Sequence, residues 1–134
     1  MDCIVVPVRY PLSMHSRETL AEAISIADEN DAELTVLHVN LYQNGKDVTR
    51  ASLRRAVERE FGALSNTRFI VRSGFLIEES ILNEAVAEEA DVVVIGHKQI
   101  GRLRRIFRRL YNEPDIEKFL RARLSCEIVT VGGD

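Results

Sequence analysis

The sequence predicts an α/β protein with a doubly wound, five-stranded parallel sheet and helices on both faces. Three observations lead to this prediction. Short apolar runs alternate with helical patterns from end to end, the runs are rich in β-branched residues, and they are apolar on both faces, as buried parallel strands are. The expected strand order is 3-2-1-4-5, and residues 1–134 are expected to form a single domain.

The first predicted strand is Cys3–Val8, a nearly continuous apolar run. A helix is expected to begin near Ser16, which we predict as its N-cap. Its apolar face consists of residues spaced three and four apart: Leu20, Ala23, Ile24 and Ala27. The second predicted strand is Leu34–Val39.

Asp47 or Thr49 is expected to cap a second helix after a polar loop. Its predicted apolar face is Leu53, Val57, Phe61 and Leu64. A short third strand, Phe69–Val71, precedes a turn at Gly74. The apolar face of the third predicted helix is Ile77, Ile81, Ala85 and Val86.

The fourth predicted strand, Asp91–Gly96, is the clearest in the chain. A basic helical segment follows it, and Glu127–Val131 is the fifth predicted strand. A doubly wound sheet binds ligands beyond the carboxyl ends of its strands, where the strand order reverses. We therefore expect a site built from residues after Val8 and after Ile95.

Composition excludes several classes of protein. Lys and Arg number 18 against 21 Asp and Glu, so the net charge is −3, and hydrophobic residues make up 46% of the chain. These values are typical of globular rather than disordered proteins, and no apolar run is long enough to span a membrane. Two cysteines, Cys3 and Cys126, are too few for a disulfide scaffold, so a reducing, cytoplasmic setting is expected, with both thiols buried and inert.

Five segments resemble the universal stress proteins in order and spacing. They are Ile4–Val8 for the opening strand, Leu34–Val39 for the second, Ala90–Gly96 for the fourth, Gly101–Arg105 for the segment after it, and Ser125–Val131 for the closing strand. The resemblance implies a five-stranded doubly wound sheet and a dimer formed through the last strand. Some members of that family bind ATP and others do not.

Members that bind ATP carry the signature Gly-x2-Gly-x9-Gly-Ser/Thr after the fourth strand and an acidic residue after the first. Glycine suits that position because backbone amides must approach the phosphates closely. This chain keeps Gly96, but Gln99 replaces the second glycine, although Gly101 offers an alternative. Arg109 and Leu110 stand in place of Gly-Ser/Thr, and Arg9 replaces the acid. We therefore expect no bound cofactor in the family's usual manner, with ATP or another phosphate-bearing ligand as the alternative.

The candidate ligand contacts surround the predicted crevice. They are Pro7, Val8, Arg9, Val39, Gly96, His97, Lys98, Gln99, Gly101 and Arg102. Arg9 either clamps a phosphate or carboxylate group or pairs with a neighbouring acid.

The stretch from Lys98 to Arg109 holds six basic residues and no acid, with apolar residues at helical spacing. One interpretation is an amphipathic helix whose arginines are solvated or paired with Glu113, Asp115 and Glu117. A second is a set of arginines that bind a phosphate-bearing ligand. Nucleic acid is disfavoured as a partner because the chain is acidic overall and lacks an aromatic stacking pattern, and no membrane partner is expected.

The remaining polar residues form no catalytic pattern. His38 is expected to be structural, His15 to lie in a loop, and His97 to face the crevice, and the three lack metal-ligand spacing. No Ser/His/Asp or Cys/His set can be assembled, so we expect a protein that is not an enzyme. We interpret the chain as a cytoplasmic regulatory or binding protein that forms a homodimer through Glu127–Val131, which is expected to lie at a sheet edge. The alternatives are an edge shielded by the polar tail and a nucleotide-binding stress protein with at most slow hydrolysis.

Overall fold

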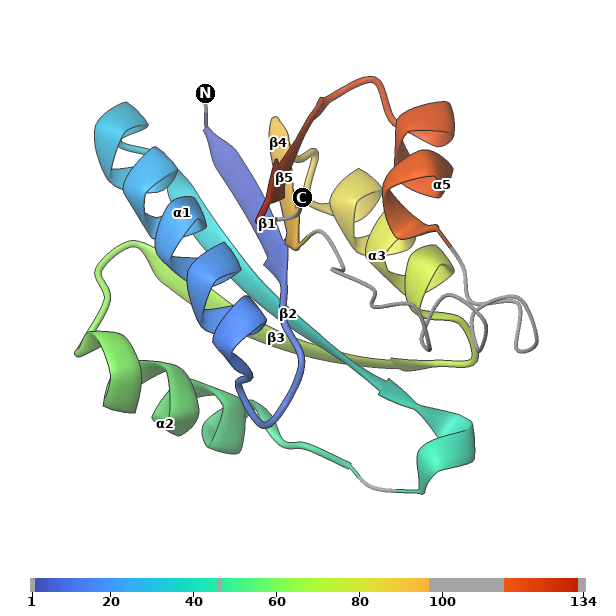
Figure 1. Ribbon diagram of the computed structural model, residues 1–134, viewed down its shortest axis with the longest axis horizontal. Coiled ribbons are helices and arrows are strands. Elements are labelled where there is room, and N and C mark those ends of the chain that lie inside the picture. The colour runs from blue at the N-terminus through green and yellow to red at the C-terminus, as the bar shows by residue number, and fades with distance from the viewer. Residues whose placement is uncertain (1, 46, 97–114, 133–134) are drawn as a thin grey trace.

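A computed structural model describes residues 2–45, 47–96 and 115–132 (Figure 1). Five parallel strands form one sheet in the order β3-β2-β1-β4-β5, which confirms the predicted fold class and strand order. The strands are β1 (Cys3–Pro7), β2 (Glu33–Leu41), β3 (Thr67–Gly74), β4 (Val92–Gly96) and β5 (Glu127–Val131).

Helices cover both faces of this sheet. They are α1 (Met14–Asn30), α2 (Arg50–Phe61), α3 (Ile77–Ala87) and α5 (Ile116–Arg123), with a short 3-10 turn, η1 (Tyr42–Asn44), after β2. Helices α1 and α2 pack on one face, and α3 and α5 pack on the other (Figure 1). In the part of the chain that the structure describes, no helix is long and apolar enough to cross a membrane.

Strand β1 contributes to both hydrophobic cores because successive side chains of a strand point to opposite faces. Ile4 and Val6 pack beneath α1 and α2, whereas Cys3 and Val5 pack beneath α3 and α5. This explains why the strand is apolar at every position, and it fixes β1 at the centre of the sheet.

The start of α1 differs from the prediction. Ser13, not Ser16, is the N-cap, and its side chain accepts a hydrogen bond from the amide of Ser16 at 3.1 Å. Ser16 lies in the first turn and is buried. Both serines fit a helix start in sequence, and the path of the preceding loop decides between them.

Other boundaries also differ, most of all those of α2 and β3. Helix α2 is capped by Thr49, one of the two predicted residues, but it ends at Phe61 because Gly62 adopts a φ of 78°. Leu64 therefore lies beyond the helix, although it still packs against the core of that face. Strand β3 is longer than the predicted Phe69–Val71 because its polar ends also pair with β2, from Leu34↔Thr67 to Leu41↔Gly74.

Helix α5 was not predicted from the sequence. Asp115 caps it by accepting a hydrogen bond from the amide of Lys118 at 3.0 Å, and Leu120 is its fully buried contact with the core. The sequence feature that indicates this helix is an Asp N-cap before a single apolar turn. One turn is too short to show the periodic spacing of apolar residues by which a helix is recognised.

Candidate functional site

The candidate crevice lies at the carboxyl ends of β1 and β4, where the chain turns to opposite faces of the sheet. Ile4 pairs with Val92 and Val5 with Val93, and Val8 and Gly96 each lie three residues further along the chain from the second pair. On the other side Pro7 pairs with Leu37, which brings Arg9 level with Val39. The fold therefore gathers Pro7, Val8, Arg9, Val39 and Gly96 at one edge, where the sequence placed them.

The backbone that leads into Arg9 is held on three sides. The amide of Val8 donates to the carbonyl of Leu37 at 2.8 Å, and Nδ1 of His38 donates to the carbonyl of Val8 at 3.0 Å. The amide of Arg9 donates to the hydroxyl of Ser16 at 3.3 Å. His38 thus has the structural role that was expected of it. The backbone at Val8 and Arg9 is fixed by these hydrogen bonds.

The side chain of Arg9 is exposed. Within residues 2–45, 47–96 and 115–132 it forms no ion pair, so the alternative in which it pairs with a neighbouring acid is not seen there. Tyr10 follows it, and the edge of the Tyr10 ring faces the ring of His38 with 6.2 Å between centroids. A guanidinium group on a fixed backbone at this edge is well placed to meet an anion.

Gly96 has a packing role that the sequence did not reveal. A Cβ atom on Gly96 would lie 2.8 Å from the hydroxyl oxygen of Thr19 on α1. Thr19 is 3% exposed, and its hydroxyl donates to the carbonyl of His15 at 2.8 Å. The absence of a side chain at Gly96 therefore allows α1 to approach β4, so this glycine by itself is no evidence of a phosphate cradle.

Sequence reasoning missed the hydroxyl groups of α1. Ser13, Ser16 and Thr19 all lie at the amino-terminal end of this helix, beside the crevice, and each bonds to a neighbouring group. The signal was the Ser-x2-Ser-x2-Thr spacing, which places all three on one side of a helix start.

The other predicted contacts have different outcomes. Val39 is half-buried and packs with the core beneath α3 and α5. His97, Lys98, Gln99, Gly101 and Arg102 lie outside the described residues, as does the rest of the basic stretch to Arg109. Cys3 is buried in the α3–α5 core, as expected, whereas Cys126 is only half-buried against it, and burial raises the pKa of both thiols above the ordinary value.

Asp91 is a structural carboxylate at the opposite, amino-terminal edge. Its Oδ2 atom accepts hydrogen bonds from the amides of Asp2 at 2.7 Å and Cys3 at 3.0 Å. These two bonds lower the pKa of Asp91 below its ordinary value. Its own backbone links β1 to β5, because its amide donates to Cys3 and its carbonyl accepts from Glu127.

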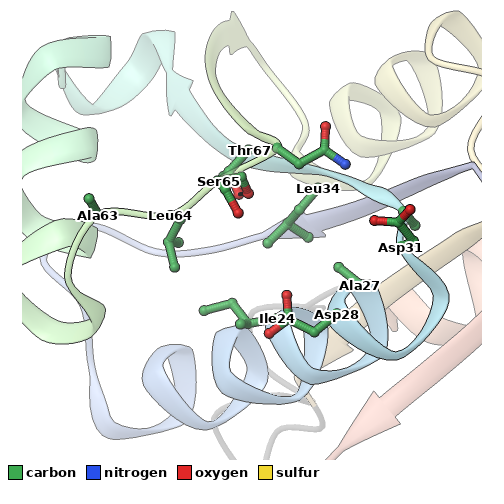
Figure 2. Close-up of a pocket in the computed structure, with 11 residues that line it drawn as sticks. Ile24, Ala27, Asp28, Asp31, Leu34, Ala63, Leu64, Ser65 and Thr67 are labelled. Atoms are coloured by element: carbon green, nitrogen blue, oxygen red, sulfur yellow. Dashed lines mark hydrogen bonds between the residues drawn. The ribbon is translucent and has the colours of Figure 1, made fainter.

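A pocket of about 260 Å³ also lies at the amino-terminal edge, away from the crevice (Figure 2). Ile24 and Asp28 of α1 form one wall, and the connection from Ala63 to Thr67 forms the other, with Leu34 between them (Figure 2). None of the predicted site residues lines this pocket. Doubly wound sheets bind ligands at the other edge, so the pocket does not support the predicted site.

Comparison with known proteins shows which of them share this fold. No family model and no curated protein matches the chain in sequence. A universal stress protein from Archaeoglobus fulgidus matches with a TM-score of 0.72 and 17% identity, over 98% of this chain and 99% of that one. A universal stress protein in complex with cAMP matches with a TM-score of 0.71 and 19% identity, over 100% of both chains. A universal stress protein from Archaeoglobus fulgidus in complex with dAMP matches with a TM-score of 0.68 and 18% identity, over 98% of both chains.

These matches define the class of protein. The chain is an open, doubly wound α/β protein. Within that class it has the universal stress protein fold, along nearly its whole length.

Proposed function

We propose that this chain is a member of the universal stress protein family that binds a small phosphate-bearing ligand at the crevice beside Arg9, without catalytic turnover. The observation that carries the proposal is the exposed guanidinium of Arg9 on a backbone pinned by His38 and Ser16. Structures of the same fold in complex with cAMP and with dAMP support a ligand of this class.

A single phosphate group suits this crevice better than a triphosphate. One arginine can pair with one phosphate through two parallel hydrogen bonds. The Gly-x2-Gly-x9-Gly-Ser/Thr signature for the longer phosphate chain is incomplete in this sequence, and Gly96 is accounted for by its contact with Thr19. We therefore expect nucleoside monophosphates or cyclic nucleotides to bind at least as tightly as ATP.

The proposal of no turnover is supported by the bonding of the polar groups near Arg9 within residues 2–45, 47–96 and 115–132. The hydroxyls of Ser16 and Thr19 and Nδ1 of His38 all hold backbone groups in place. Nucleophilic catalysis needs a hydroxyl beside a base, and these groups are instead bonded to the main chain.

Calorimetric titration with cAMP, AMP and ATP tests the ligand. We expect cAMP or AMP to bind at one site per chain, and Arg9→Gln to weaken binding by about 10-fold. Arg17→Gln is the matched control, because Arg17 lies on nearby α1 and pairs with Glu60 at 3.1 Å. Micromolar ATP binding that Arg9→Gln leaves unchanged, or release of phosphate from ATP, would contradict the proposal.

We also propose a two-fold dimer through β5. The two edge strands of the sheet are β3 and β5. The side chains of Arg68 and Arg72 on β3 are 48% and 55% exposed, and charges on an edge strand discourage pairing with another chain. Residues 128–131 of β5 carry no charge, so two copies can pair there without opposing like charges.

Proline substitution tests which edge pairs. In a parallel ladder alternate residues bond to the same neighbour, so Thr130 of β5 and Ser73 of β3 direct their amides outward. Thr130→Pro should convert a dimer into a monomer in sedimentation velocity, whereas Ser73→Pro should leave it intact. The reverse pattern would place the dimer at β3.

A further inference from the structure

The outer edge of β5 is already partly occupied by a side chain of its own protein. The amide of Glu127 donates to the carbonyl of Asp91 at 3.1 Å, so Glu127 bonds toward β4. Because the direction alternates along a parallel strand, Ile128 and Thr130 direct their backbone groups away from β4. The carbonyl of Ile128 accepts a hydrogen bond from Nη2 of Arg121 at 3.0 Å.

Arg121 is aimed at this carbonyl from helix α5, which runs beside β5 (Figure 1). Its Nε donates to Oε2 of Glu117 one turn earlier, at 2.8 Å. The guanidinium therefore bridges Glu117 and the strand, and its side chain is 48% exposed. A charged donor makes a stronger hydrogen bond than an amide does, so the bond lowers the free energy of the unpaired edge.

Antiparallel pairing of two β5 strands needs the same oxygen. A two-fold axis centred on Thr130 sets Ile128 opposite Gly132 of the second copy, the residue just after β5, which has a φ of 79° in the single chain. The carbonyl of Ile128 would then accept from the amide of that glycine. Arg121 and the second copy are thus directed at the same outward-facing carbonyl oxygen.

We propose that Arg121 limits self-association by occupying the Ile128 carbonyl, and that dimerisation displaces it. This inference rests on the β5 dimer proposed above, and the second copy of the chain is the partner. The dissociation constant of the dimer is then higher than strand pairing alone would give. Each association breaks two arginine bonds, one in each copy, so a change at Arg121 acts twice.

Measurement of the dimer dissociation constant by analytical ultracentrifugation tests the inference. Arg121→Ala should tighten the dimer by at least about 10-fold, since a hydrogen bond from a charged group that must be broken is removed from each copy. Arg123→Ala is the matched control. It removes the same charge from the same helix, but Arg123 donates to the carbonyl of Phe119 at 3.2 Å and lies over the Phe119 ring. It should leave the dissociation constant within about 3-fold of the wild-type value.

Circular dichroism must show that both variants are folded, and Arg121→Gln provides a second variant that keeps a weaker, neutral donor and should fall between wild type and Arg121→Ala. Equal or weaker association of Arg121→Ala would overturn the role of Arg121. If Thr130→Pro still dissociates the wild-type dimer in that case, the β5 dimer stands and only the competition fails. If wild type and Arg121→Ala are both monomers at every concentration, both proposals fail.

Discussion

Replacement of Gly96 by alanine should destabilise the protein through one contact, the hydroxyl oxygen of Thr19. The new Cβ would lie 2.8 Å from that oxygen and 4.0 Å from the Cβ of Thr19. The hydroxyl cannot easily rotate away, because Thr19 is buried and the group bonds to the carbonyl of His15. Either α1 moves away from β4, or the hydroxyl loses its partner.

The expected cost follows from these two routes. Gly96 itself is exposed, but its new methyl group would clash with the buried Thr19, and overpacking of this kind typically costs about 1–3 kcal/mol. Part of this cost is offset because alanine leaves the unfolded chain less conformational freedom than glycine does. That effect stabilises the folded state by about 0.4–1 kcal/mol. We therefore expect Gly96→Ala to lower the free energy of unfolding by about 1–2 kcal/mol.

A double-mutant cycle isolates the contact. Urea unfolding followed by circular dichroism would be measured for Gly96→Ala, Thr19→Ala and the double variant. In the Thr19→Ala background the hydroxyl is gone, so Gly96→Ala should be neutral or slightly stabilising. Thr19→Ser keeps the hydroxyl and should keep the full cost. The reasoning is refuted if Gly96→Ala costs the same with and without the Thr19 hydroxyl.

Three further changes are predicted. Asp91→Asn should destabilise the protein above the ordinary carboxyl pKa, because hydrogen bonding lowers the pKa of Asp91 in the folded state. The difference from wild type should shrink as the pH falls from about 5 to about 3, and urea midpoints that keep a constant difference would be evidence against this. Because burial raises the pKa of Cys3 and of Cys126, both thiols should react with a disulfide reagent near pH 8 more slowly in the folded than in the unfolded chain, and equal rates would contradict their burial. Arg72→Ala should lower the free energy of unfolding by about 1–3 kcal/mol, because it leaves the carboxylate of Glu84 without its cationic partner. The side chain of Glu84 is 5% exposed, and its Oε1 accepts a hydrogen bond from Arg72 at 2.8 Å. Glu84→Gln in that background should recover part of the loss in urea unfolding, and no recovery would show that the buried charge is not the cause.

The sequence alone predicted most of the architecture, because a buried parallel strand must be apolar on both faces. The runs at Cys3–Val8 and Asp91–Gly96 are of this kind, and in the structure β1 and β4 are both interior strands of the sheet. The right-handed crossover rule then predicted helices on both faces of the sheet. Elements with weaker periodicity were harder to predict. Strand β3 was expected too short, and α5 was missed because one apolar turn gives no clear pattern.

The placement of Arg9 and Gly96 at the same edge of the sheet was also predictable, since parallel strands bring their carboxyl ends together, whereas the binding of a ligand there stays a prediction. The role of each residue there was not predictable. Hydrophobic periodicity states which side of an element is buried, but not which atom lies opposite. Only the packing of α1 against β4 shows that Gly96 makes room for Thr19, and only the turn from α5 into β5 brings Arg121 to the Ile128 carbonyl. Such contacts depend on distances of a few ångströms between elements, and a linear pattern of residue types does not encode these distances.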